Sequence, residues 1–194
     1  MRTSEPRVTV SKAMPFSRAA VAAFPLSCRT LAESAAQALA PFVDDSYRGI
    51  SVDAFVLGET VQIPTRIHLV GLDEGKLQGN CWHMTQCLCT RSTDGYLRHA
   101  SLRRVLPINE PWSIPFVVLL AGEYVVEIIE DMVASVSALD RERYVNFVRE
   151  NRIMMRLLRQ KANSYWDCYY RHSYPDRSAY PGVAFLGQLE LWAG

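Results

Sequence analysis

The chain has 194 residues, 49% of them hydrophobic, which suits a globular protein with a sizeable core. Its 21 lysines and arginines balance 20 aspartates and glutamates, and this excludes recognition of nucleic acid or of an acidic membrane by net charge alone. Five cysteines, odd in number and unevenly spread, predict free thiols in a reduced, cytoplasmic location.

The N-terminal segment, residues 1–26, contains three prolines and no regular hydrophobic period. We therefore predict an extended arm or packed coil, with a short strand at Arg7–Val10. Charges and prolines interrupt the segment, so it lacks the apolar core of a secretory signal peptide. Because it contains arginine and serine and few acidic residues, an organelle-targeting segment is the alternative.

The chain then changes from a helical to a strand pattern. Between Ser27 and Val43 apolar residues fall at helical spacing, which predicts one helix. From Ser46 to Val70 apolar and polar residues alternate, with Gly58-Glu59 where a hairpin turn is expected. Residues 1–78 are thus predicted to form a subdomain with an arm, a helix and a small β-hairpin or sheet.

The remainder of the chain, residues 79–194, predicts a bundle of about five helices. The expected fold class is therefore α+β and mostly helical, and we expect the two parts to form one structural domain. The predicted helices span residues 80–90, 95–106, 112–136, 137–150 and 152–171.

The stretch Trp112–Val136 is apolar at nearly every position, and this predicts one long buried helix at the centre of the bundle. Gly122 within it suggests that another element crosses closely there. A membrane span is the alternative, but carboxylates in its second half make a span costly. These carboxylates form one narrow stripe on the predicted helix: Glu123, Glu127, Glu130 and Asp131.

A turn motif lies between two of the predicted helices. The residues 94–98, Asp-Gly-Tyr-Leu-Arg, place an aspartate in the turn and an arginine early in the second helix. The span His83 to Leu106 resembles one helix–turn–helix unit of the HEAT type, which implies a packed helical pair. No convincing second copy follows at the spacing of such repeats.

Three arginines form a stripe on the last predicted helix: Arg152, Arg156 and Arg159. One interpretation pairs this stripe with the acidic stripe across an antiparallel helix contact, where each exposed pair adds only about 0–1 kcal/mol. The alternative is that the arginines face outward and bind an acidic partner or phosphates.

A cluster of soft ligands contains Cys81, His83 and Cys87, followed by Cys89. Zinc requires thiolates and imidazoles that converge in a tetrahedron, and one regular helix cannot direct all of these side chains to one point. We therefore predict no metal site and no cofactor. The first three residues are the only metal-ligand candidates, and burial of the cysteines as small hydrophobic residues is the preferred interpretation.

A second reactive group lies near the end of the last predicted helix. Cys168 and His172 are four residues apart, and Asp167 is adjacent to the cysteine. A thiol, an imidazole and an orienting carboxylate form the pattern of an activated nucleophile. The alternative is a structural cysteine beside a histidine that complements the helix dipole. These three residues are the only catalytic candidates.

The stretch from Ser164 to Pro181 interleaves aromatic rings with arginines and a histidine. Such residues dominate protein interfaces, and they also stack unpaired bases. The alternative is that the rings pack the tail onto the bundle. The predicted partner-contacting residues are Tyr170, Arg171, His172, Tyr174, Arg177 and Tyr180, together with the arginine stripe Arg152, Arg156 and Arg159.

The sequence contains no phosphate-binding loop, dinucleotide fingerprint, zinc-protease motif or nucleophile elbow. We therefore predict a non-enzymatic cytosolic protein of the adaptor or inhibitor type, which binds another protein and does not enter a membrane. A thiol-dependent hydrolase or transferase using Cys168 and His172 is the alternative. Single-stranded nucleic-acid binding is a third hypothesis, and a homo-oligomer remains open.

Overall fold

The computed structural model describes residues 14–44, 47, 49–72, 79 and 81–194. These residues are mostly helical with one two-stranded antiparallel sheet, which confirms the predicted α+β fold class. The chain forms two compact units, Met1–Ser101 and Leu102–Gly194. The division falls within α4 (Gly95–Val105), whereas the sequence pattern placed it at residue 78.

The first unit contains the predicted hairpin, formed by β1 (Ser51–Val56) and β2 (Glu59–Pro64). Its turn residues Leu57 and Gly58 have φ angles of 53° and 82°, the left-handed pair that a two-residue type I′ turn requires. The turn therefore starts one residue earlier than predicted. The alternating pattern buries one face of the hairpin, which includes Ala54, Val56, Val61 and Ile63.

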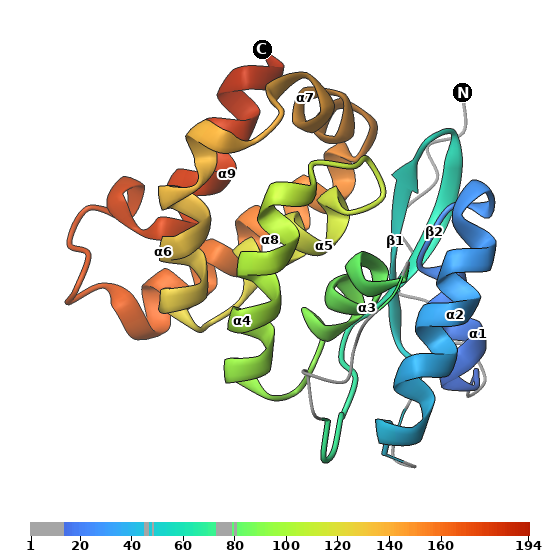
Figure 1. The fold of residues 1–194 in the computed structure, drawn as a ribbon. Helices are drawn as coiled ribbons and strands as arrows, with labels where there is room; N and C mark the ends of the chain where they lie inside the picture. The colour runs from blue at the N-terminus through green and yellow to red at the C-terminus, as the bar shows by residue number, and fades with distance from the viewer. Residues whose placement is uncertain (1–13, 45–46, 48, 73–78, 80) are drawn as a thin grey trace. The chain divides into compact units, whose positions relative to one another are not determined.

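Helices cover this hairpin face (Figure 1). α1 (Phe16–Ala22) packs against α2 (Arg29–Leu39) and β2, and α3 (Trp82–Cys89) packs against α2. The prediction of an arm or coil is wrong for residues 16–22, because two turns of helix are too short to show a hydrophobic period. The predicted strand Arg7–Val10 lies outside the described residues.

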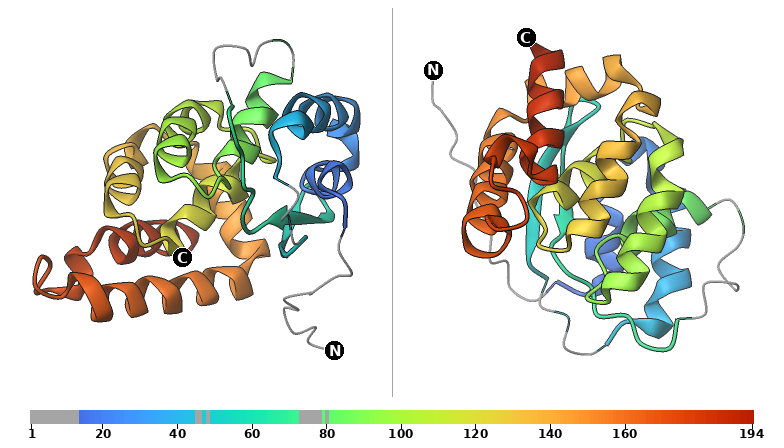
Figure 2. Two further views of the ribbon diagram at one scale, coloured as in Figure 1. Left: turned by 90° about the horizontal axis from the view of Figure 1, so that it is seen from below. Right: turned by 90° about the vertical axis from the view of Figure 1, so that its left-hand side faces the viewer.

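The second unit, all of which is described, contains α5–α9 besides the end of α4. α9 packs against α6, α7 and α8 (Figure 2), and the sequence analysis predicted no helix in this segment. Pro181 in its first turn was the available signal. The helices span Ile114–Val118, Val126–Ala134, Arg141–Glu150, Arg152–Tyr165 and Pro181–Ala193.

Short turns of other helical types connect these elements. A π-helical turn covers Trp166–Tyr170 directly after α8. The 3₁₀ turns in the described residues include Leu26–Cys28, Ala40–Phe42, Leu106–Ile108, Leu119–Gly122, Val136–Ala138 and Arg177–Ala179.

The stretch 112–136 is largely buried, as predicted, but the prediction of one continuous helix is wrong. The helical part that begins with α5 ends at Gly122, the backbone at Glu123 is extended, and α6 starts at Val126. The predicted close crossing at Gly122 is confirmed, because a Cβ there would lie 2.8 Å from Leu158 Cδ2 of α8. Glu123 is buried and therefore does not belong to an exposed stripe. No helix among the described residues has the length and apolar character needed to cross a membrane.

Gly182 marks the closest approach of α9 to its surroundings. A Cβ at this position would lie 3.0 Å from the carbonyl oxygen of Ala121 and 3.3 Å from the Cβ of Ala162. At Gly187, on the same helix, the nearest atoms to an added Cβ are the guanidinium nitrogens of Arg159, at 3.7 and 3.9 Å. Only the first glycine is therefore required by packing.

We expect Gly182→Ala to lower the free energy of unfolding by about 1–3 kcal/mol, because the added methyl group overpacks this crossing. Gly187→Ala is the matched control and should leave stability unchanged or raise it by up to about 1 kcal/mol through its better helix propensity. Urea denaturation followed by circular dichroism measures both. Equal stability of the two variants would contradict the close crossing at Gly182.

Candidate functional site

The acidic and basic stripes do not pair with each other, so that interpretation of the sequence is wrong. Arg159 pairs with Glu190 of α9, and Asp131 pairs with Arg103 of α4. The sequence pattern had paired α8 with α6, but the ion-pair partners lie on α9 and α4. The buried position of Glu123 removes a further member of the acidic stripe.

Arg152 and Arg156 face outward on α8. Both side chains are exposed, and neither forms an ion pair or hydrogen bond with a described residue. They line a hollow of about 320 Å³ together with Val148, Met155, Arg159 and Glu190. Because the pair between Arg159 and Glu190 is internally neutral, the hollow carries the uncompensated charge of two guanidinium groups.

The predicted interface tyrosines pack largely within the unit. The Tyr170 and Tyr180 rings stack with centroids 5.3 Å apart, and Tyr174 meets Tyr180 edge to face at 5.7 Å. Tyr180 is completely buried. The Tyr174 hydroxyl donates to Glu130 Oε1 at 2.7 Å, and the Tyr170 hydroxyl donates to the Tyr124 carbonyl. These contacts hold the segment after α8 on α6 and on the break that precedes it.

The pKa values of the Tyr170 and Tyr174 hydroxyls are consistent with a role as hydrogen-bond donors within the unit. Burial, and then the hydrogen bond to Glu130, raise the pKa of Tyr174 to about 12. Burial is also the main cause that raises the pKa of Tyr170. Both hydroxyls therefore stay protonated near neutral pH and remain hydrogen-bond donors.

The charged residues of the same segment are exposed. The Arg171 guanidinium lies 5.3 Å from the centroid of the Trp166 ring and pairs with Asp167. His172 and Arg177 are exposed at the surface. The predicted aromatic and arginine surface is thus divided: its tyrosines mostly face inward, and its charged side chains face solvent.

The catalytic candidates are not assembled into a reactive group. Cys168 is exposed in the π-helical turn, and no hydrogen bond joins it to His172, a described residue. The Asp167 carboxylate pairs with Arg171, so it is directed to a guanidinium rather than to the imidazole. A thiol nucleophile needs a base within hydrogen-bond reach, and this arrangement does not provide one.

The metal-ligand candidates are separated by burial. Cys87 and Cys89 are buried, Cys81 is half-buried, and His83 is exposed. Burial raises the pKa of the Cys87 thiol well above its ordinary value and that of Cys89 to about 12, which disfavours the thiolate that a metal requires. Within the described part of the chain, no three His, Cys, Asp or Glu side chains are grouped to hold a metal ion.

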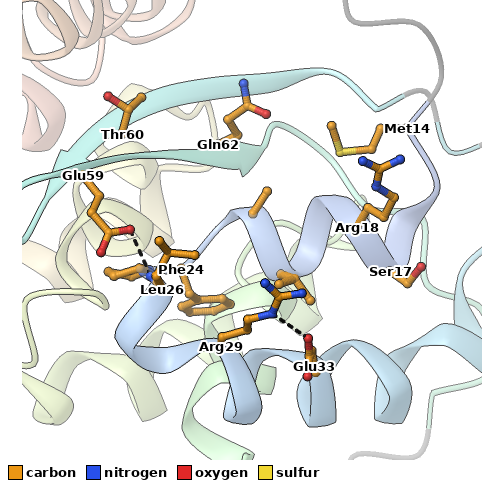
Figure 3. Close-up of a pocket in the computed structure, with 13 residues that line it drawn as sticks. Met14, Ser17, Arg18, Phe24, Leu26, Arg29, Glu33, Glu59, Thr60 and Gln62 are labelled. Carbon is orange, nitrogen blue, oxygen red and sulfur yellow. Dashed lines mark hydrogen bonds and ion pairs between the residues drawn. The ribbon is translucent and has the colours of Figure 1, made fainter.

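A pocket of about 660 Å³ in the first unit was not anticipated from the sequence. Figure 3 shows α1 and the start of α2 on one side and β2 on the other. The backbone N–H of Leu26 donates to Glu59 Oε2 at 3.0 Å, and Arg29 pairs with Glu33 at 2.9 Å. The sequence predicted the hairpin but not α1, so it offered no signal for a pocket between them.

No protein-family model matches the chain, and no curated protein or solved structure shows a similarity to it. Function therefore has to be inferred from the arrangement of the side chains. Three features enter that inference: the hollow between Arg152 and Arg156, the inward-facing tyrosines and the pocket beside β2.

Brief treatment of the folded protein with iodoacetamide near neutral pH should modify Cys168 and leave Cys87 and Cys89 unmodified. Cys168 is exposed, whereas burial keeps the other two thiols inaccessible and protonated. Peptide mass spectrometry measures each site, and all three should react in denaturant. Modification of Cys87 as fast as Cys168 in native buffer would contradict the buried assignment.

Tyr180→Phe should leave the free energy of unfolding unchanged or raise it by up to about 1 kcal/mol, because the buried hydroxyl has no hydrogen-bond partner among the described residues. Tyr174→Phe is the matched comparison and should cost about 0.5–1.5 kcal/mol, since it loses the bond to Glu130. Chemical denaturation measures both. A substantial loss for Tyr180→Phe would show that its hydroxyl is bonded.

Proposed function

We propose that the protein is a non-enzymatic, protein-binding module of the adaptor type, and that it recognises an acidic segment of its partner. The binding surface is the arginine edge, defined as Arg152 and Arg156 of α8. One observation carries this proposal: these two exposed guanidinium groups have no carboxylate within the described chain, whereas the neighbouring Arg159 is paired with Glu190.

The chemistry of the hollow favours carboxylates from a peptide. Each guanidinium offers planar, paired donors that match a carboxylate, and two such groups one helical turn apart suit successive acidic side chains. Val148 and Met155, both buried, line the same hollow and give the arginine stems an apolar surface. The hollow of about 320 Å³ is the size of a few side chains, so it fits a short segment.

Nucleic-acid binding receives less support. Single strands are held by rings that stack on successive bases and by a basic groove that follows the backbone. Tyr180 is buried, Tyr170 and Tyr174 pack against it, and the formal net charge of the chain is only +1. The rings that would stack on bases are therefore already in contact with one another.

A thiol-dependent enzyme receives the least support, because Asp167 is paired with Arg171 and no hydrogen bond joins Cys168 to His172 or to another described residue. All five cysteines are free, and this is the basis on which we propose a reducing, cytoplasmic environment. The segment that resembles a HEAT unit adds no support, because α3 and α4 make little contact with each other. In the structure Arg98 donates to the Ser92 and Thr93 carbonyls and so fixes its turn.

The test uses a fluorescein-labelled peptide of about a dozen residues, rich in paired glutamates, and measures fluorescence anisotropy with the full chain. Changing both Arg152 and Arg156 to glutamine should weaken binding about tenfold, because two charge-assisted contacts are lost. Binding should also weaken as salt rises. Replacing the glutamates of the peptide by glutamine should have the same effect as the double variant.

Arg177→Gln is the matched control, since it removes one exposed arginine from the aromatic segment and should leave binding unchanged. Unchanged affinity in the Arg152 and Arg156 double variant would refute the arginine edge. A loss confined to Arg177→Gln would instead assign binding to the aromatic segment. Tighter binding of an oligouridine than of the acidic peptide would overturn the proposal in favour of nucleic acid.

A further inference from the structure

The hairpin of the first unit has an open edge along β2. The two-residue turn makes Val56 and Glu59 a hydrogen-bonded pair, and such pairs alternate with non-hydrogen-bonded pairs along an antiparallel ladder. Thr60 and Gln62 occupy non-hydrogen-bonded positions, so their backbone N–H and C=O groups point away from β1. No described residue takes up these groups. An edge of this kind is a template for a further strand.

The pocket of about 660 Å³ runs beside this edge, and we name it the β2 slot. Figure 3 shows Thr60 and Gln62 on the strand, with Arg18 and Leu26 toward opposite ends of the opening. Leu26 is 70% exposed and gives the slot an apolar rim. The residues of the slot used below are Arg18, Val21, Phe24, Leu26, Thr60 and Gln62.

Two arginines and two glutamates line the slot, so its formal charge is zero, but of these described residues only Arg29 and Glu33 form an ion pair. Glu33 pairs with Arg29, and Glu59 accepts the hydrogen bond from the Leu26 backbone. Arg18 is exposed and has no ion pair with a described residue. An occupant that satisfies the slot therefore needs a free strand edge, apolar side chains and a carboxylate near Arg18.

We propose that the β2 slot binds an extended segment of another protein, which adds to the hairpin as a third strand. Backbone hydrogen bonds to Thr60 and Gln62 supply the pairing, the apolar wall of Val21 and Phe24 accepts alternate side chains, and Arg18 meets an acidic residue. A second copy of the chain fits less well, because the one carboxylate on its own β2, that of Glu59, already accepts a hydrogen bond from Leu26. The β2 slot lies in the first unit and is independent of the arginine edge.

The probe is a pool of labelled peptides of about ten residues, with varied apolar residues at alternate positions and one central aspartate. Wild-type protein should enrich binders from the pool. Methylation of alternate backbone nitrogens in the best binder should reduce its affinity at least about tenfold, since strand pairing is blocked. Gln62→Pro should reduce affinity about fivefold to tenfold, because it removes an outward donor and proline is tolerated at a strand edge.

Gln62→Val is the matched control, because it removes the same side chain but keeps the backbone N–H, and it should bind like wild type. Arg18→Gln should weaken the aspartate peptide about fivefold and leave its asparagine counterpart unaffected. Lys161→Gln, which removes an exposed cation in the other unit, should change neither.

Three results would overturn the proposal. They are the absence of any enriched peptide, equal binding of the N-methylated peptide, and a dimer in sedimentation that Gln62→Pro dissociates. The last result would make a second copy the occupant. The N-methylated peptide tests strand pairing on the wild-type protein, so the proposal remains testable even if Gln62→Pro fails to fold. Because the arginine edge is tested with other variants and another peptide, failure of either proposal is recognised separately.

Discussion

The packing of the second unit depends on one close backbone contact, between Gly182 at the start of α9 and the carbonyl of Ala121. A Cβ at this position would lie only 3.0 Å from that oxygen, so glycine favours the close approach of α9, which packs against α6, α7 and α8. Tyr180, two residues earlier, is buried by the same approach. With its far end fixed there, the segment after α8 turns its tyrosines toward α6, where Tyr174 bonds to Glu130. Internal packing therefore occupies the rings, and charged side chains remain for the surface.

The parts of the fold that follow from local sequence were predictable. Alternation and a glycine in the turn indicate the hairpin, and the helical spacing between Ser27 and Val43 indicates α2. Composition also indicated that residues 112–136 are largely buried. Gly122 indicated the close crossing that α8 makes, but the break after it was not predictable, because apolar residues continue on both sides of the glycine. α9 was missed because aromatic and proline residues before it resemble an irregular tail, and α1 because it is only 7 residues long.

The candidate surfaces show the same limit. Periodicity correctly placed Arg152, Arg156 and Arg159 on one helix, but it contained no information on which of them would find a partner. Arg159 pairs with Glu190, a residue of the helix that was missed, and this pairing is what distinguishes it from the other two. The sequence also did not show which aromatic residues are buried, since a tyrosine is suited both to a protein core and to a protein interface. Only the tertiary contacts separate Tyr180, which is buried, from exposed Tyr169.

The two proposed surfaces would recognise partners by different physics. The arginine edge acts through charge, so its strength depends on the number of carboxylates and on salt, and hardly on the backbone conformation of the partner. The β2 slot acts through the backbone groups of Thr60 and Gln62, which every extended peptide can satisfy, so hydrogen bonding alone gives little selectivity. Selectivity must then come from the side chains around that edge, namely the apolar wall and Arg18. The β2 edge and Arg18 together favour one kind of ligand, an extended apolar segment that contains an acidic residue.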